Sequence, residues 1–280
     1  MGRYQGVAPS LPSRPVRFVD FSLSPIEEIQ PWGDPGRQSL SWFGFSLGLY
    51  RLKFGEHLLL NYSDAVMSRW AHDYPDAYTG SYVDYQVVRL WEDLLQLLPH
   101  VLRPVPPALG EAMALSEREW RLMGPERRPV EQGSLRQNAV DVVGLWRDQH
   151  FLDSGYLSPS AAISFWLVDD RITVRWENQE KMVGDDPAWS ASEGTFSLPR
   201  VEFISGVQAF NDEFMQAMGG RVNRICANWN RPEVRVDLAG LRQEQSDRSQ
   251  WLARALGRSP ADDCVSDVVR AFEVLKSPHQ

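Results

Sequence analysis

The chain has 280 residues, with 37 acidic against 29 basic side chains and a formal net charge of -8. Its hydrophobic fraction of 43% is that of an ordinary globular protein, which excludes wholesale disorder. The negative charge weighs against a nucleic-acid-binding protein, which normally presents a basic face, and it favours a basic protein partner. Two cysteines, neither in a Cys-x-x-Cys pair, are too few for a disulfide scaffold and indicate the reducing cytoplasm.

The sequence contains no predicted membrane span or secretion signal. Its longest uncharged stretch, residues 154–168, is too short to cross a bilayer. Residues 1–15 carry prolines and arginines but no apolar signal core, and we expect them to form a mobile arm. We therefore expect a cytoplasmic protein that does not associate with membranes.

The first half of the chain predicts an antiparallel sheet followed by a helix. Residues 16–23 alternate well enough for a strand, and residues 39–62 contain three further runs, typical of a meander with one apolar and one polar face. Residues 61–81 predict a polar loop. Apolar side chains then recur with the 3.6-residue period of a helix over residues 82–98. The polar side of this helix is predicted to carry Arg89, Glu92, Asp93 and Gln96.

The second half of the chain repeats the order of the first. Residues 162–168 and 171–176 predict a hairpin, and residues 195–198 predict a further strand. A helix is expected to begin near Val201 and to end at Gly219-Gly220, because glycine readily adopts the left-handed conformation of a helix stop. Each half is therefore predicted to be a small antiparallel sheet with one amphipathic helix.

These elements predict an α+β fold of two sheet-plus-helix halves, residues 16–102 and residues 134–230. A connector rich in Pro, Gly, Glu and Arg, residues 103–133, joins them and contains one expected helix near residues 116–123. We expect the two halves to pack as one compact unit.

The tail, residues 231–280, is predicted to be helical. Asp237 has the chemistry of a helix cap, and the helix that it opens is expected to run to Ala255. A last helix extends through Leu275. We expect the two to form a C-terminal helical hairpin that docks on the second half.

No motif in the sequence indicates a cofactor, a metal or a catalytic set. There is no Walker A loop, no Gly-x-Gly-x-x-Gly, no zinc-binding histidine pair and no nucleophile elbow. His72 and Asp73, with Asp76 nearby, are hard ligands, but a solvated loop is favoured over a cation site, which needs several convergent oxygens. We expect no cofactor, no metal and no catalytic residue.

Two polar residues fall within predicted apolar helix faces. Asp84 is interpreted as the N-cap of the first helix, with Val83 packing on Val88 as a hydrophobic staple. The alternative is a buried carboxylate with a raised pKa that acts as a general acid or base. Asn211 is interpreted as a buried amide that fixes a neighbouring loop by hydrogen bonds.

The segment 146–157 concentrates polar side chains just before a predicted strand. His150 and Asp153 have the chemistry of an orienting pair in a triad-like site, but no nucleophile motif accompanies them. A structural ion pair between Arg147 and Asp153 is the favoured interpretation.

Several segments resemble the landmarks of a family of uncharacterised bacterial proteins. They are Pro31-Trp32-Gly33, Leu40-Ser41-Trp42-Phe43, Tyr82-Val83-Asp84-Tyr85 with Val88-Arg89-Leu90-Trp91-Glu92-Asp93-Leu94-Leu95, Leu152-Asp153-Ser154-Gly155-Tyr156-Leu157 and Val174-Arg175-Trp176-Glu177-Asn178. The resemblance extends through Arg235-Val236-Asp237 and Trp251-Leu252, and so covers roughly residues 16–275. It implies a bacterial cytoplasmic protein and transfers no activity and no catalytic residue.

The function favoured by the sequence is non-enzymatic binding of a basic protein partner. One form of it is an immunity protein that neutralises a toxin by occlusion. Acidic and aromatic side chains would cover a basic active cleft of the partner. The binding residues that we predict are Asp73, Asp76, Tyr78, Tyr82, Arg147, His150 and Asp153.

Two other functions stay open at this stage. One is a hydrolase in which Asp73, Asp84, His150 and Asp153 converge from the two halves. The other is a sensor or carrier that binds a small ligand in a cleft lined by some of the 11 tryptophans.

Overall fold

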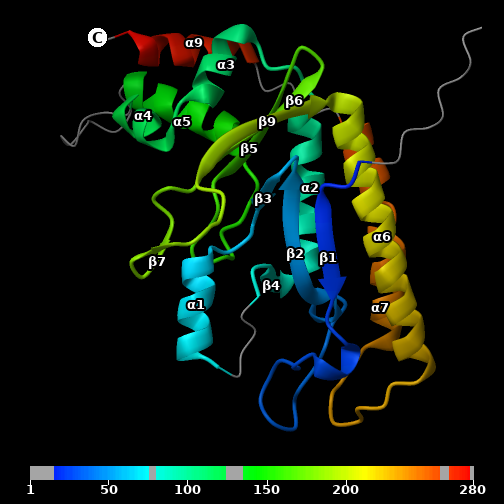
Figure 1. Cartoon of the computed structure of the whole chain (residues 1–280). Coiled ribbons are helices and arrows are strands. Elements are labelled where there is room, and N and C mark those ends of the chain that lie inside the picture. Colours follow the sequence, from blue (N-terminus) through cyan, green and yellow to red (C-terminus); the bar gives the residue numbers. More distant parts are fainter. Residues whose placement is uncertain (1–15, 76–79, 124–134, 259–264, 278–280) are drawn as a thin grey trace, which may run out of the picture.

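The computed structural model describes residues 16–75, 80–123, 135–258 and 265–277 (Figure 1). Its helices and antiparallel sheets confirm the α+β class. The predicted mobile arm, the end of the connector and the start of the last helix lie outside the described residues, as do Asp76 and Tyr78. Among the described residues, no helix combines the length and apolarity that a bilayer span requires.

The first sheet is built around its second strand. It contains β1 (Val19–Leu23), β2 (Leu47–Phe54), β3 (His57–Leu59) and β4 (Val83–Gln86). β1 pairs with β2 along one side, and β3 and β4 pair with different parts of the other side, all antiparallel. At the β2–β3 turn, Gly55 has a φ of 60° and a Cβ there would lie 2.9 Å from the Phe196 ring, so this turn requires glycine.

The second sheet has the strand order β5-β6-β9. The bounds are Ile163–Val168 for β5, Arg171–Glu177 for β6 and Glu193–Pro199 for β9. Asp169 and Asp170 form the predicted turn with φ values of 47° and 60°, a left-handed pair that suits a two-residue hairpin. A separate small hairpin consists of β7 (Met182–Val183) and β8 (Asp186–Pro187).

Two helices pack against these sheets, as the sequence predicts. In each of them, one end lies at a different residue from the predicted end. Helix α2 (Val87–Val101) begins later than expected, because residues 83–86 pair with β2 as a strand. Helix α6 (Arg200–Ala227) continues through Gly219-Gly220, so the predicted stop is wrong. A Cβ on Gly219 would meet the Gln245 side chain at 3.5 Å, which shows how closely the next helix approaches there.

Aromatic rings connect the two sheets through α6. Phe18 stacks on Phe54 and on Phe203 of α6, with ring centroids 5.1 and 5.4 Å apart. Phe165 of β5 contacts the same Phe54 and Phe203, at 6.1 and 5.8 Å. One buried cluster therefore includes residues of both sheets, α2 and α6.

Several segments predicted as loop or connector are helical. Helix α1 (Asp64–Asp73) occupies the predicted polar loop, and the Ser63 hydroxyl caps it by accepting from the Val66 N–H at 3.2 Å. The connector forms α3 (Pro107–Ala114), which was not predicted, and α4 (Glu117–Met123), which confirms the helix expected near residues 116–123. It leads to α5 (Leu135–Asp148), a helix that the sequence did not predict. Short 3₁₀ turns occur at Ile26–Glu28 and Gly44–Ser46.

The tail helices pack on different parts of the molecule. They are α7 (Leu238–Arg248), α8 (Trp251–Gly257) and α9 (Val265–Lys276). Asp237 caps α7 as predicted, because its carboxylate accepts from the Gly240 N–H at 2.9 Å. However, α7 packs on α6 and α8 packs on α2, whereas α9 packs on α5 and α3. The tail is therefore divided between two regions instead of docking on the second half as one hairpin.

A second buried cluster lies under α3, α5 and α9, which gather with α4 at one end of the molecule (Figure 1). Val143 of α5, Leu109 of α3 and Phe272 of α9 form its centre, and Trp166 of β5 joins it from the outer face of the second sheet. We call α3, α4, α5 and α9 the helical layer.

Candidate functional site

Three tryptophans surround a cation that belongs to the chain itself. The guanidinium of Arg248 lies 4.5 Å from the ring centroid of Trp42, 6.0 Å from that of Trp91 and 4.7 Å from that of Trp251. Its charge is balanced by ion pairs to the carboxylates of Glu92 and Glu244. Arg248 fills this aromatic cage, so the three rings stabilise a cation of the fold itself. Trp251 also lines a cavity of about 290 Å³ between α2 and α8.

Asn211 is a buried, hydrogen-bonded amide, as the sequence predicts, but it fixes a helix instead of a loop. Its side-chain oxygen accepts from the Trp91 indole N–H at 3.1 Å, and its amide donates to Asp212 at 3.0 Å. The hydrogen bond to Trp91 joins α6 to α2, so the amide fixes a helix.

Asp84 is neither an N-cap nor a buried acid. It lies exposed on β4, opposite Leu49 of β2, and the N-cap of α2 is Gln86. Partial desolvation raises the pKa of its carboxyl. Both interpretations of Asp84 are wrong, because strand pairing with β2 takes the residues that periodicity assigned to the first turn of the helix.

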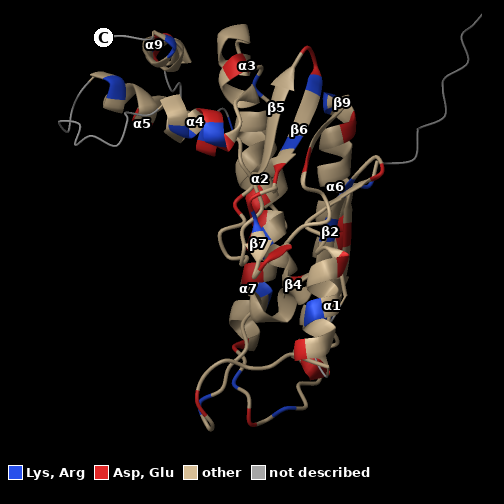
Figure 2. Cartoon of the chain, turned by 60° about the vertical axis from the view of Figure 1, so that its left-hand side comes forward, with Lys and Arg blue, Asp and Glu red and all other residues tan. Residues whose placement is uncertain are grey.

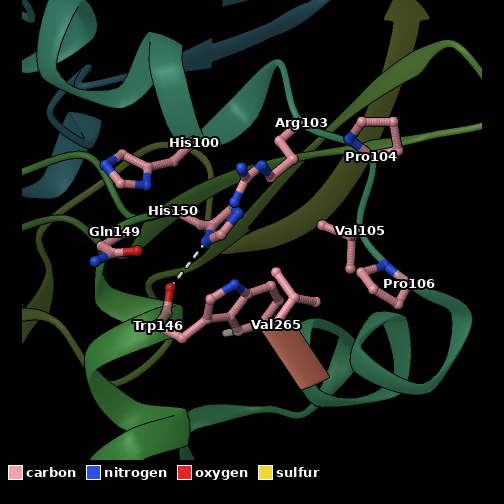
Figure 3. A pocket seen from close by; sticks show the side chains of 9 residues that line it. All are labelled: His100, Arg103, Pro104, Val105, Pro106, Trp146, Gln149, His150 and Val265. Atoms are coloured by element: carbon pink, nitrogen blue, oxygen red, sulfur yellow. Dashed lines mark hydrogen bonds between the residues drawn. The ribbon is translucent and has the colours of Figure 1, made fainter. Parts of the chain in front are cut away.

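His150 lines a small cavity at the end of α5 (Figure 3). Its Nδ1 is 2.9 Å from the Trp146 carbonyl oxygen, and its ring centroid is 6.3 Å from that of His100. Burial lowers the pKa of His150 to about 4, so the imidazole is neutral at physiological pH. The cavity, about 20 Å³, has room for little more than a water molecule.

Asp153 does not orient His150 and does not pair with Arg147. Its carboxylate lies 3.9 Å from the Arg89 guanidinium and accepts from the Gly155 N–H at 3.0 Å. The triad-like pair of His150 and Asp153 is therefore not formed, since the imidazole is held by a backbone carbonyl. Asp73 lies exposed at the end of α1 and Asp84 lies on β4, so these four residues are not brought together as a catalytic set.

Arg147 is buried between two aromatic rings. Its guanidinium lies 4.5 Å from the ring centroid of Trp120 and 5.7 Å from that of Phe151, and it donates to the Leu115 carbonyl at 3.2 Å. Burial lowers the pKa of Arg147 to about 10. The predicted ion pair with Asp153 is replaced by this aromatic stacking, which joins α5 to α4.

Arg147 and Asp153 nevertheless line the same cavity, which has a volume of about 480 Å³. It lies between α4, the end of α5, the segment 151–162 and β6. Its charged and aromatic lining residues are Glu117, Trp120, Arg147, Asp148, Phe151, Asp153, Glu177 and Lys181. Four carboxylates thus face two cations, one of which is stacked on aromatic rings. We call this space the acidic cavity.

A second cavity, about 540 Å³, adjoins the acidic cavity and shares Glu117, Glu177 and Lys181 with it. Its charges are largely paired with one another. Arg121 of α4 pairs with Glu180 at 3.0 Å, and Arg175 pairs with Glu177 at the same distance. Acidic and basic residues lie together along α4, which forms one wall (Figure 2).

Asp93 is a buried acid that the sequence analysis placed on the polar face of its helix. Its side chain is 2% exposed, and Tyr156 is hydrogen-bonded to it. The Tyr50 hydroxyl donates in turn to the Tyr156 oxygen at 3.3 Å. Burial raises the pKa of Asp93 to about 7, with Asp153 acting in the same direction and Arg89 acting against it. Tyr156 and Asp153 are distant from Asp93 in the sequence, and helical periodicity carries no signal of such long-range neighbours.

Tyr82 and Asp73 are the described residues of the predicted binding loop. Arg51 stacks on the Tyr82 ring at 4.3 Å from its centroid, which holds this ring against the first sheet. Asp73 is exposed at the end of α1. The acidic cavity and this loop therefore involve different elements.

The arrangement defines an α+β protein with an acidic, aromatic-lined cavity and, among the described residues, no cluster of side chains that would hold a metal ion. The chain belongs to a family of unknown function (DUF5984), whose model matches residues 18–271. No curated protein matches the sequence, and no solved structure matches it either.

Proposed function

We propose that the protein is a non-enzymatic binding protein whose acidic cavity receives a basic side chain of a protein partner. The observation that carries this proposal is the lining of the cavity, in which four carboxylates outnumber two cations beside two aromatic rings. An arginine or lysine of the partner would meet charge of opposite sign and apolar surface for its methylene groups.

Glu177 is already paired with Arg175, but three other charges of the lining support a cationic ligand. The guanidinium of Arg147 already contacts the rings of Trp120 and Phe151 and donates to the Leu115 carbonyl. Its positive charge is therefore partly compensated within the fold. Asp148 is exposed at the end of α5, where a helix C-terminus also favours a cation. Asp153 shares Arg89 with Glu92.

The biological role that we infer is occlusion, as in an immunity protein that covers the basic active cleft of a toxin. The net charge of -8 supports it, because long-range attraction accelerates association with a basic partner. A bacterial cytoplasmic setting is part of the same proposal and rests on the sequence resemblance and on the two cysteines. The loop with Asp73, Asp76, Tyr78 and Tyr82 stays a predicted second contact surface.

The test is affinity capture from the native host with wild type and with the double variant Asp148→Lys/Asp153→Lys. Asp141→Lys is the matched control, because Asp141 is exposed on the same helix and does not line the cavity. We expect a basic partner that is retained by wild type and by Asp141→Lys and is lost from the double variant at an unchanged melting temperature. Equal retention by all three proteins at low salt would contradict the role of the cavity.

Occlusion has its own measurement. If the captured partner is a toxin, co-expression of wild type should restore growth of cells that produce it, and co-expression of the double variant should not. A captured partner whose activity is unaffected by saturating wild-type protein would contradict occlusion and leave binding intact.

A further inference from the structure

The buried Asp93 lies where α2 meets the segment 152–157, which we call the wall segment because Asp153, Ser154 and Gly155 line the acidic cavity. From the wall segment, the Tyr156 hydroxyl and the Asp153 carboxylate act on the pKa of this carboxyl, the first lowering it and the second raising it. Its Oδ2 is buried and has no hydrogen-bond partner among the described residues. An ionised carboxylate with an unsatisfied buried oxygen is costly, whereas the neutral acid is tolerated.

Aromatic residues close the other sides of Asp93. The Tyr85 ring of β4 stacks on the Tyr156 ring, with centroids 4.9 Å apart. The Tyr50 hydroxyl of β2 donates a hydrogen bond to the Tyr156 oxygen. Burial raises the pKa of both phenols, so both stay neutral. None of these tyrosines carries a charge, and the Tyr156 hydroxyl stabilises an Asp93 carboxylate too little to offset its burial.

Arg89 is the cation that faces this group, and several acids share it. It lies 3.5 Å from Glu92, 3.9 Å from Asp153 and 5.2 Å from the Tyr156 ring centroid. Glu92 has a second partner, Arg248, but the wall segment is joined to α2 electrostatically through the contact of Arg89 with Asp153.

We propose that the proton on the buried Asp93 carboxyl controls how tightly the wall segment closes over α2, and thereby controls the shape of the acidic cavity. When Asp93 is neutral, Arg89 is available to Asp153 and the wall segment is closed. When Asp93 loses its proton, the new carboxylate attracts Arg89 and repels Asp153, so the wall segment loosens.

The proton balance of the step is simple. Asp93 releases one proton to solvent, no other group changes charge, and no bond between heavy atoms forms or breaks. The pKa of Asp93, about 7, places this exchange in the physiological range. The proton-controlled closure stands on the contacts of Asp93, Arg89 and Asp153. Its consequence for binding rests on the proposed function of the cavity.

The test is hydrogen exchange of the amides in residues 152–157 at pH 6 and pH 8, corrected for the intrinsic pH dependence of exchange. It needs no ligand, so its failure is distinguishable from failure of the proposed function. We expect protection in wild type to fall roughly tenfold between the two values, as one proton titrates. Asp93→Asn keeps the shape of the neutral acid, so its protection should be the same at both values. Pronounced pH dependence that persists in Asp93→Asn would overturn the proposal.

Asp153→Asn keeps the test decisive even if Asp93→Asn fails to fold, because Asp153 is largely exposed. This variant removes the charged partner that Arg89 has on the wall segment, so its protection at pH 6 should already be as low as that of wild type at pH 8. Asp141→Asn, on the exposed side of α5, is the control that should leave the protection unchanged. A wild type without any pH-dependent protection, or an Asp153→Asn variant that keeps the wild-type protection at pH 6, would refute the proposal.

Discussion

At the scale of single residues, Asp93 predicts how stability depends on pH. Its pKa in the folded state is about 7 against an ordinary value of 3.8, so the native state binds a proton that the unfolded state has lost. The free energy of unfolding should therefore fall as pH rises through this interval, by up to about 1.4 kcal/mol per pH unit, and level off above it. Asp93→Asn should remove this slope and be more stable than wild type at pH 8. Urea unfolding of both proteins from pH 5 to pH 8 measures the difference.

His150 changes the pH dependence of stability in the opposite direction, so its contribution must be separated from that of Asp93. Its folded pKa is about 4 against 6.5, so its contribution to stability is present above about pH 6.5 and is lost as pH falls toward 4. The two slopes oppose each other over much of the same range. Only the difference between wild type and Asp93→Asn isolates Asp93, and parallel stability curves for the two proteins would contradict its raised pKa.

The sequence alone identified one buried polar side chain and missed another. Asn211 was recognisable as a buried amide, because it falls within the apolar arc of its own helix. Asp93 was not, because it falls on the polar arc of α2 and is buried by Tyr156, which is 63 positions away in the sequence. Arg147 and Asp153 were correctly grouped in one segment, but their partners, Trp120 and Arg89, come from other elements.

At the scale of elements, replacing two glycines of α6 by alanine should change the stability of the protein in opposite directions. Gly220 is exposed in the helix, and a Cβ there would meet nothing within 4 Å, so Gly220→Ala should stabilise the protein by roughly 0.5–1 kcal/mol. Gly206 faces Phe18 so closely that a Cβ would overlap its ring. Gly206→Ala should therefore destabilise by about 1–3 kcal/mol through overpacking. Thermal unfolding of the two variants beside wild type compares them directly, and a destabilising Gly220→Ala would show that α6 is not continuous there.

Element types were predictable where the pattern was long and local. The hairpin of β5 and β6 follows from alternation around Asp169 and Asp170, and the cap of α7 follows from Asp237. The start of α2 was not predictable, because residues 83–86 satisfy helical periodicity and become a strand only by pairing with β2. Helix α5 was missed because apolar residues occur on both of its sides, with Val143 buried and Leu145 exposed.

At the scale of the whole molecule, the acidic cavity lies between two separately packed parts. Trp120, Arg147 and Asp148 belong to the helical layer, whereas Glu177 lies on β6 of the second sheet. The helical layer has its own buried cluster, to which the second sheet contributes Trp166. A ligand in the cavity would contact both parts, so binding and the docking of the helical layer should stabilise each other.

This division predicts that the helical layer opens without the rest of the fold. Phe272 is 1% exposed in the second cluster, and its replacement by Ala should cost about 3–5 kcal/mol where that cluster is formed. In Phe272→Ala, the amides of α5 and α9 should lose protection from hydrogen exchange, whereas those of α2 and α6, whose side chains pack in the first cluster, should keep it. Phe203→Ala, in the first cluster, is the matched control and should reduce protection in α2 and α6. If Phe272→Ala lowered protection equally in all four helices, the two clusters would unfold as one cooperative unit, and the cavity would have no independently mobile wall on the side of the helical layer.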